Sequence, residues 1–259
     1  MVRPLSVGIL IVGNEILDGI VLDTNSNWLV SRLKAFALHV KEFMTVRDEV
    51  PEISKGIRRM IEDRCELVFT LGGLGPTHDD KTLRGVAAAF DLPLELNEEA
   101  LRIVERQYKT LHGRGVVETS EITEARKKMA FLPIGAKPLD NRVGTAPGVL
   151  LERRETTVIC LPGVPVELRW IFDNEVSEML RGKVRGIFKE QIVAVPSRDE
   201  SSLSPVIDRI MAQFPGVYIK SMVHVPEEGT HSIRLWVSAY GDTKEEVENR
   251  LSKVLEELK

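Results

Sequence analysis

Cysteine is scarce in this chain. Its 259 residues include only Cys65 and Cys160, and both stand among apolar neighbours. Two such residues do not form the framework of a disulfide-rich secreted protein, so we predict buried thiols in a reducing compartment. No second cysteine or histidine stands at metal-ligand spacing from Cys65, which argues against a metal site there.

Long apolar runs are also missing. No stretch approaches the roughly 20 residues that a membrane-spanning helix needs. The apolar run 7–12 is too short for a signal peptide and leads directly into a polar loop, so we predict a core strand. We therefore expect a cytoplasmic protein that has no membrane partner.

An excess of positive charge is absent as well. The formal net charge is -4, which argues against a general nucleic-acid binder. Hydrophobic residues make up 43% of the chain and charged residues 29%, as in ordinary globular proteins. The length allows a sizeable core and one or two domains.

Several familiar catalytic patterns do not occur. The glycine spacing matches neither the Walker P-loop nor the dinucleotide-binding fingerprint. No Ser-His-Asp or Cys-His set can be argued from order or spacing. The glutamate-rich helix of Nudix hydrolases is missing too.

The most informative segment that is present is the glycine-rich stretch 70–82, TLGGLGPTHDDKT. It follows an apolar run that predicts a buried strand, and it precedes an amphipathic helix. Its glycines let the backbone approach a ligand, and the N-terminus of the following helix suits a phosphate. Asp79 and Asp80 add hard oxygen ligands for Mg²⁺. An ordinary glycine turn with an N-cap aspartate has the same pattern, so the motif alone favours a phosphate site by roughly two to one.

Apolar strands alternate with amphipathic helices through the first 180 residues. This order indicates an α/β fold with a parallel sheet covered by helices on both faces. In such sheets ligands bind beyond the carboxyl ends of the strands, where the loops after 5–12 and 67–71 lie. The expected strands are 5–12, 39–46, 67–71, 149–151 and 158–161, and the expected helices lie around 28–36, 53–61, 98–111, 118–129 and 167–180.

A smaller segment follows. Its pattern predicts strand 187–195, a helix, strands 217–223 and 232–239, and a last helix that opens with the capping box 243–246. We therefore predict a domain at 1–182 and a small α+β module at 187–259. The element order is loosely like that of KH domains, but their Gly-x-x-Gly clamp is absent, so nucleic acid is not an expected partner. His224 and His231 show no ligand pattern.

Five motifs occur in order along the first segment. They are Gly13-Asn14-Glu15, Asp23-Thr24-Asn25, Gly72–Thr77 with Asp79, Asp80 and Thr82, Asn141 with Gly144–Gly148, and Leu161–Pro165 with Glu167. Together they resemble the motifs of the competence/damage-inducible CinA family and, more broadly, those of the molybdopterin-binding domain of molybdenum-cofactor biosynthesis, the MoaB/Mog-like proteins. The resemblance covers nearly all of the first segment and implies a three-layer α/β/α fold whose loops share one pocket.

The resemblance implies several activities. Members of the broad superfamily bind or adenylylate molybdopterin, CinA-type proteins hydrolyse the pyrophosphate of ADP-ribose with a divalent metal, and a similar domain in eukaryotic FAD synthases is associated with FAD hydrolysis. The chain stops at Lys259, so we do not expect the C-terminal amidase domain of bacterial CinA, which deamidates nicotinamide mononucleotide. Related domains self-associate, so we expect a homo-oligomer, either a dimer or a trimer.

The resemblance also assigns catalytic residues. Asp80 is the first choice for a catalytic metal ligand, and Asp79 is the second. Glu15 could ligate the metal or orient water, or it could bind the amides of its own loop. The expected cofactor is Mg²⁺, with Mn²⁺ and Co²⁺ as alternatives. Asp79 could instead be an exposed N-cap.

The expected ligand is a nucleotide or a pterin phosphate. The backbone of the glycine loop would hold phosphate oxygens, and Thr82 would contact phosphate or cap its helix. Capping is favoured for Asp23, and Asn141 and Thr145 would bind a base, ribose or pterin or else shape their turn. Glu167 is expected to cap the helix after Pro165, and His78 to be a surface turn residue. The substrate-binding candidates are Gly13, Asn14, Asp23, Asn25, Gly72, Gly73, Gly75, Thr77, Thr82, Asn141, Gly144, Thr145, Pro147 and Gly148.

Our preferred hypothesis is metal-dependent hydrolysis of a nucleoside-diphosphate linkage of the ADP-ribose type. This chemistry needs charge neutralisation and in-line positioning more than a protein nucleophile. The alternatives are molybdopterin or nucleotide binding without turnover and adenylylation of molybdopterin. The glycine loop and the carboxylates are compatible with hydrolysis, with binding and with adenylylation, so the sequence does not distinguish among these three functions.

Overall fold

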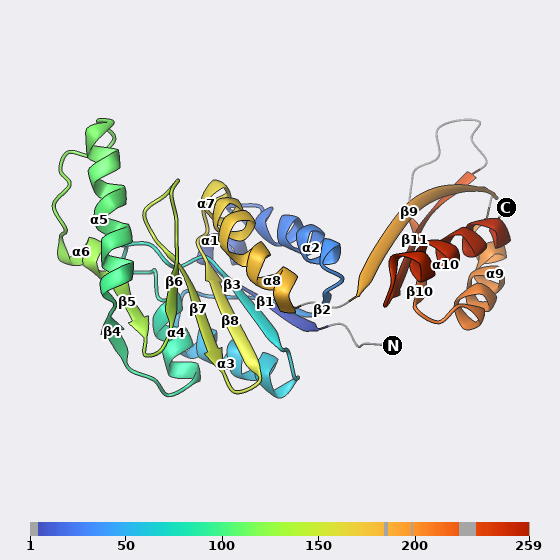
Figure 1. Cartoon of the computed structure of the whole chain (residues 1–259), viewed down its shortest axis with the longest axis horizontal. Coiled ribbons are helices and arrows are strands. Elements are labelled where there is room, and N and C mark those ends of the chain that lie inside the picture. The colour runs from blue at the N-terminus through green and yellow to red at the C-terminus, as the bar shows by residue number, and fades with distance from the viewer. Residues whose placement is uncertain (1–4, 184–185, 198, 223–231, 259) are drawn as a thin grey trace. The chain divides into compact units, whose positions relative to one another are not determined.

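The computed structural model of the chain describes residues 5–183, 186–197, 199–222 and 232–258. They fall into two compact units (Figure 1). The larger unit consists of residues 5–33 and 38–183, and the smaller is built chiefly from the residues that follow. His224 and His231 lie outside the described residues.

The larger unit contains a six-stranded sheet in the order β2-β1-β3-β8-β7-β6. The first four strands of this order run parallel, and β7 and β6 run antiparallel to their neighbours. The prediction of a mostly parallel sheet is therefore confirmed. The bounds are Ser6–Val12 for β1, His39–Val46 for β2, Leu67–Leu71 for β3, Lys137–Leu139 for β6, Gly148–Arg153 for β7 and Thr156–Leu161 for β8.

Helices cover both faces of this sheet. Figure 1 shows α2 (Asn25–Ala35), α7 (Pro165–Ile171) and α8 (Ser177–Lys183) on one face, and α3 (Val50–Glu62) and α4 (Thr82–Ala89) on the other. A π-helical segment, Phe172–Val176, joins α7 to α8. Because both faces are covered, every residue of β1, β3 and β8 is buried, which explains why these strands are mostly apolar.

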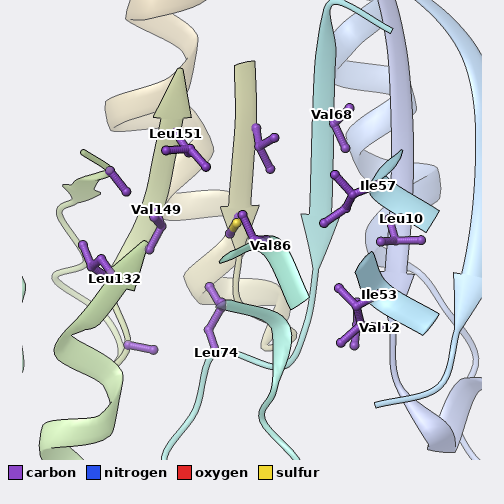
Figure 2. Close-up of a cluster of buried hydrophobic side chains, with 14 of the residues drawn as sticks. Leu10, Val12, Ile53, Ile57, Val68, Leu74, Val86, Leu132, Val149 and Leu151 are labelled. Carbon is purple, nitrogen blue, oxygen red and sulfur yellow. The ribbon is translucent and has the colours of Figure 1, made fainter. Parts of the chain in front are cut away.

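The core beneath α3 and α4 shows how the periodicity of the sequence produces packing. Ile53, Ile57 and Met60 recur at helical spacing along α3, and all three are fully buried. Figure 2 shows Ile53 and Ile57 facing Leu10 and other strand residues. Each such side chain contributes about 1.5–3 kcal/mol of transfer free energy on burial.

The segment between α4 and β6 departs most from expectation. Strands β4 (Leu94–Leu96) and β5 (Phe131–Pro133) pair as a small antiparallel sheet, and α5 spans Glu98–Gly113. The predicted helix 118–129 is wrong in extent, because only α6 (Glu124–Lys127) and a 3₁₀ turn (Lys128–Ala130) are helical.

A local network explains this shortening. The Thr123 hydroxyl accepts a hydrogen bond from the Arg126 amide and so begins the helix late. The Arg126 guanidinium donates to the carbonyl oxygens of Thr119 and Glu121, each over 2.7 Å, and lies 3.8 Å from the Tyr108 ring centroid. These bonds hold 119–121 in an irregular conformation.

The smaller unit has a three-stranded antiparallel sheet in the order β10-β11-β9. Helix α10 begins at the predicted cap, where the Thr243 hydroxyl accepts from the Glu246 amide over 3.2 Å. Its core includes Leu235 and Val237. The elements are β9 (Ile187–Pro196), α9 (Glu200–Gln213), β10 (Val217–Met222), β11 (Ser232–Gly241) and α10 (Lys244–Glu257), in the predicted order.

Both cysteines are free and buried, as predicted. Complete burial raises the pKa of the Cys160 thiol to about 12. Among the described helices, none is long and apolar enough to cross a bilayer.

Candidate functional site

The glycine loop bends sharply at the carboxyl end of β3. Gly72 and Gly73 have φ angles of 99° and 67°, a region that strongly favours glycine. A Cβ atom on Gly72 would overlap the carbonyl oxygen of Val12, and one on Gly73 would overlap the Thr82 hydroxyl. The Gly72 amide donates to the carbonyl oxygen of Leu161 over 2.9 Å. The loop is thus packed tightly between the ends of β1 and β8 and the start of α4.

Thr77 fixes the two adjacent carboxylates. Its amide donates to Oδ2 of Asp80 over 2.9 Å, and its hydroxyl lies 2.5 Å from the same atom and 2.5 Å from Oδ1 of Asp79. The hydrogen bond from Thr77 holds the pKa of Asp79 below its usual range. Both carboxylates are therefore directed by one residue of the loop, and His78 is exposed beside them, as predicted.

A fourth acidic residue, Asp48, was not predicted. It follows β2 and is buried, and its carboxylate accepts from the Asn14 amide over 2.7 Å. Burial raises its pKa, and the negative charges of Glu15, Asp79 and Asp80 raise it further. The negative charges of the loops after β1 and β3 thus disfavour the ionised form of the carboxylate that follows β2. Asp48 stands two residues after an expected strand, so the rule that ligands bind beyond strand ends could have identified it.

The first loop forms a small cavity with the loop after β8. This cavity, of about 130 Å³, is lined by Glu15, Asp23, Asn25, Gly72, Gly163 and Pro165 together with apolar residues. Asp23 caps α2 as predicted, because its Oδ1 accepts from the amides of Asn25 and Ser26. The Asn25 amide group donates to the Gly163 carbonyl oxygen over 2.7 Å. Asn25 Oδ1 is buried and has no donor among the described residues.

A larger cavity, of about 350 Å³, lies on the other side of the bend. Gly73, Gly75 and Asp80 line it together with Arg84 and Lys128. The Lys128 ammonium donates to the Thr77 carbonyl oxygen. Burial lowers the pKa of Lys128, and the nearby charges of Asp80 and Asp79 oppose this shift. Arg84 and Lys128 were not predicted, because a single cation in a helical segment has no distinguishing sequence signal.

The Asn141 loop is directed inward. The Asn141 side chain is fully buried, and its amide group donates to the Ala146 carbonyl oxygen and to the Glu167 carboxylate. Its Oδ1 accepts from the amides of Val143 and Gly144. All of these bonds shape the turn, which was the alternative to ligand binding. In the part of the chain that the structure describes, neither of the two cavities is lined by the predicted substrate-binding residues of this loop, which are Asn141, Gly144, Thr145, Pro147 and Gly148.

Glu167 holds this loop and does not cap its own helix, contrary to expectation. Its carboxylate accepts from Asn141 over 2.7 Å, and the N-cap residue of α7, Val164, makes no side-chain capping bond. Burial raises the pKa of Glu167. A Cβ on Gly144 would overlap this carboxylate, so Gly144 provides the space that Glu167 occupies.

The side chains beside the glycine loop bear on the predicted metal. Among the described residues, no group of three or more His, Cys, Asp or Glu residues could hold a metal ion by itself. Asp79 and Asp80 form a pair of hard oxygen donors beside a glycine loop. Mg²⁺ commonly binds through one or two carboxylates, several waters and substrate phosphates, so this pair fits that cation.

Comparisons with known proteins agree with this fold. Residues 8–182 match the family model described as "Probable molybdopterin binding domain". A protein from Aeropyrum pernix is 40% identical over 252 residues, which cover 97% of this chain and 91% of that protein. A protein from Pyrobaculum arsenaticum is 38% identical over 251 residues, which cover 96% of this chain and 92% of that protein.

One solved structure is similar to the larger part of the chain. It is the crystal structure of a protein named CinA, with unknown function, from Thermoplasma acidophilum. It is 32% identical with a TM-score of 0.61, and the match covers 68% of this chain and 98% of that one. The chain therefore belongs to the molybdopterin-binding domain family and is a CinA-like member of it.

Proposed function

We propose that this chain is a metal-dependent hydrolase of a nucleoside-diphosphate linkage of the ADP-ribose type. The observation that carries the proposal is the pair of carboxylates, Asp79 and Asp80, that Thr77 fixes beside the glycine bend. Like charges destabilise one another unless a cation or a proton neutralises them. A cation at this position would lie beside the loop that suits phosphate.

The chain's own residues have distinct tasks in this reaction. Asp80 and Asp79, held by Thr77, would bind Mg²⁺, which when bound neutralises the charge on the diphosphate. The backbone of Gly73 and Gly75 lines the larger cavity and would donate to phosphate oxygens. Glu15 would accept a proton from the attacking water. The water oxygen forms a bond to phosphorus while the phosphoanhydride bond breaks, which yields AMP and ribose 5-phosphate from ADP-ribose.

Product analysis tests this proposal directly. The purified chain is incubated with ADP-ribose, FAD or ATP and with Mg²⁺, Mn²⁺ or Co²⁺, and AMP is measured by chromatography. We expect metal-dependent AMP from ADP-ribose or FAD. If no substrate yields AMP with any of the three metals, the hydrolase proposal is wrong.

The second candidate is molybdopterin binding or adenylylation, and the family match favours it. The same glycine loop and carboxylates would then hold a pterin phosphate without hydrolysis. Tight binding of molybdopterin in calorimetry, together with no AMP from ADP-ribose or FAD, would favour this function. Formation of adenylylated molybdopterin from ATP would identify the transferase.

We also propose that copies of the chain associate as a dimer or trimer. Ile20 and Leu22 are 76% and 84% exposed, beside the half-exposed Val21. Exposed apolar patches of this kind mark contact surfaces. Light scattering should give a mass two or three times that of the chain, and Leu22→Lys should lower it. A monomeric mass for the wild-type chain would contradict this.

A further inference from the structure

Strand β9 lies at the edge of the sheet in the smaller unit. It pairs with β11 over ten residues, Ile187–Pro196, and in the part of the chain that the structure describes no strand pairs with its other side. Every second residue of such a strand directs its amide and carbonyl groups away from the sheet. Strands are most often about 5–6 residues long, so β9 has a long open edge. Its single proline is the last residue and does not interrupt this edge.

Natural edge strands are commonly protected by charged side chains, and β9 has little of this protection. Its two charged residues are Lys189 and Glu190. The Lys189 ammonium pairs with Glu248 of α10 over 2.5 Å, and the Glu190 carboxylate accepts from the Trp236 indole over 2.8 Å. The remaining segment 191–196, QIVAVP, carries no charge. Another extended chain can therefore approach this segment without repulsion between like charges.

The strand at the opposite edge of the same sheet is different. β10 has only six residues, and the exposed Lys220 lies near its middle. A lysine on an edge strand discourages pairing with a further strand, because the partner would have to bury or displace the charge. Of the two edges of this sheet, β9 is therefore the one suited to pairing.

An apolar cavity of about 350 Å³ lies beside β9. Val195 and Leu258 are buried in its wall, whereas Val193 and Leu255 are only half-buried. All four belong to the hydrophobic core of the smaller unit or pack against it, so this core is incompletely covered at the β9 edge. An apolar surface of this kind marks a contact with another protein surface. The lining is completed by Gln191 and Ala194.

A second copy of β9 matches both the open edge and the cavity. Figure 1 shows α9 and α10 on one face of the sheet, and a two-fold axis perpendicular to the sheet keeps the helices of both copies on that face. Residues of the same face then lie opposite each other, and the residue on the axis lies opposite its own copy. Gln191, Val193 and Val195 share the inner face, because each lies opposite a core residue of β11.

These three residues also determine the register. With Val193 on the axis, Gln191 of each copy lies opposite Val195 of the other, and the uncharged segments overlap. The two cavities then meet across the axis, where the apolar lining of one copy covers that of the other. Two-fold contacts in which both copies use the same surface are the commonest arrangement in homo-oligomers.

We propose that two copies of the chain pair antiparallel through β9, with Val193 at the two-fold axis, and that the two three-stranded sheets become one continuous sheet. Hydrogen bonds between the backbones of the two edges provide affinity, and the side chains that close the cavity provide specificity. A two-fold contact joins two copies, so this inference specifies the dimer among the oligomers proposed above. It does not depend on the hydrolase proposal.

Disulfide formation at the axis tests the pairing. Val193→Cys is introduced into the full chain, which is oxidised mildly and examined on a non-reducing gel. Opposite residues of paired antiparallel strands have Cα atoms about 4.5–5.5 Å apart, which is within the range of a disulfide. We therefore expect a covalent dimer. The wild-type chain should remain uncrosslinked, because Cys65 and Cys160 are buried.

Two matched controls on the same face test the register. In Gln191→Cys and in Val195→Cys, each cysteine would lie four positions along the strand from its own copy, a separation of about 13 Å. We expect neither variant to crosslink alone and an equal mixture of the two to crosslink. Absence of the disulfide in Val193→Cys, or crosslinking of Gln191→Cys with itself, would overturn the proposal.

Charges beside the axis provide a second test in the Val193→Cys background. Ile192 is 47% exposed, so Ile192→Lys should leave the fold of each copy intact. In the paired strands the two lysines would be diagonal neighbours about 7–8 Å apart, and their repulsion should lower the crosslinked fraction about tenfold or more. A mixture of the Ile192→Lys and Ile192→Glu copies should restore crosslinking, because opposite charges then meet.

Met222→Lys is the control for the added charge. It replaces an exposed apolar residue of β10, at the other edge of the same sheet, and should leave crosslinking unchanged. Equal crosslinking in Ile192→Lys and Met222→Lys would contradict pairing through β9. Light scattering of the wild-type chain should give twice the mass of one copy, and a monomeric or trimeric mass would also overturn the proposal. None of these measurements uses turnover, so they are decided separately from the hydrolase proposal.

Discussion

The Thr82 hydroxyl donates to the carbonyl oxygen of Gly72 over 2.7 Å, and the Thr82 amide donates to the carbonyl oxygen of Gly73 over 3.1 Å. Thr82 is fully buried at the first position of α4. Its side chain therefore fixes the glycine bend, and neither of the roles considered from the sequence, phosphate contact or helix capping, describes it. The bend is held from within the protein before any ligand binds.

We expect Thr82→Val to lower the free energy of unfolding by about 1–3 kcal/mol, because the buried Gly72 carbonyl loses its donor. Thr82→Ser keeps the hydroxyl and is the matched control, with a smaller loss from the missing methyl group. Urea unfolding followed by circular dichroism measures both. Equal stability of the valine and serine variants would show that the hydrogen bond does not hold the loop.

Gly72→Ala should be strongly destabilising. The new Cβ would overlap the Val12 carbonyl oxygen, and the φ angle of 99° is unfavourable for alanine. We expect a loss of about 2 kcal/mol or more in the same unfolding experiment, since strain of this kind costs about 1–3 kcal/mol even without a clash. Gly113→Ala is the control, because nothing lies within 4 Å of a Cβ there, and it should be neutral or slightly stabilising. Similar losses in both variants would contradict the close packing of the bend.

The larger part of the fold could be predicted from the sequence because its signals are strong. The strands at 6–12 and 67–71 are continuous apolar runs, and Ile53 and Ile57 mark the inner face of α3. The three-residue strands β4, β5 and β6 could not be predicted, because alternation cannot be recognised over so few positions. The expected helix 118–129 was wrong because tertiary bonds from Arg126 outweigh local helix propensity.

Only part of the candidate site could be predicted from the sequence, because some of its residues have a local sequence signature and others do not. The glycine loop and Asp23 have local signatures that follow from backbone geometry and capping. The placement of Lys128 and Asp80 in the lining of one cavity depends on the bond from the 3₁₀ turn Lys128–Ala130 to the glycine loop, and no local pattern encodes it. The inward direction of Asn141 depends on Glu167, which is 26 residues away in the sequence.

Glu167 should give the chain a pH-dependent stability. Burial raises its pKa, so the folded protein binds a proton more tightly than the unfolded chain does. This contribution to stability is full below the ordinary glutamate pKa and is lost as the pH rises through the raised value. Glu167→Gln keeps an acceptor for Asn141 and removes the titration, so its stability relative to wild type should increase from pH 4 to pH 7.

Thermal unfolding at a series of pH values measures this difference. Glu155→Gln, in the exposed turn between β7 and β8, is the matched control and should show no such trend. A stability difference between Glu167→Gln and wild type that does not change with pH would contradict the assigned shift. A difference that decreases as the pH rises would have the wrong sign.

Asp80→Asn separates binding of the cation from folding. The asparagine oxygen can still accept from the Thr77 amide, so the loop should keep its conformation and the Tm should change little. Loss of the charge should lower metal-dependent kcat by about 100-fold or more, the range found when one electrostatic contact to a transition state is removed. Asp91→Asn changes an exposed aspartate that pairs with Arg58, and it should retain wild-type kcat.

Chelation provides the complementary arm of this experiment. EDTA should abolish AMP formation by the wild-type chain, and added Mg²⁺ should restore it, whereas Asp80→Asn should need a higher Mg²⁺ concentration for any activity that remains. The Mg²⁺ dependence is the decisive readout, because a merely structural role for Asp80 would lower kcat without changing the concentration of metal required. Wild-type activity in Asp80→Asn, or full activity in EDTA, would remove Asp80 from the site.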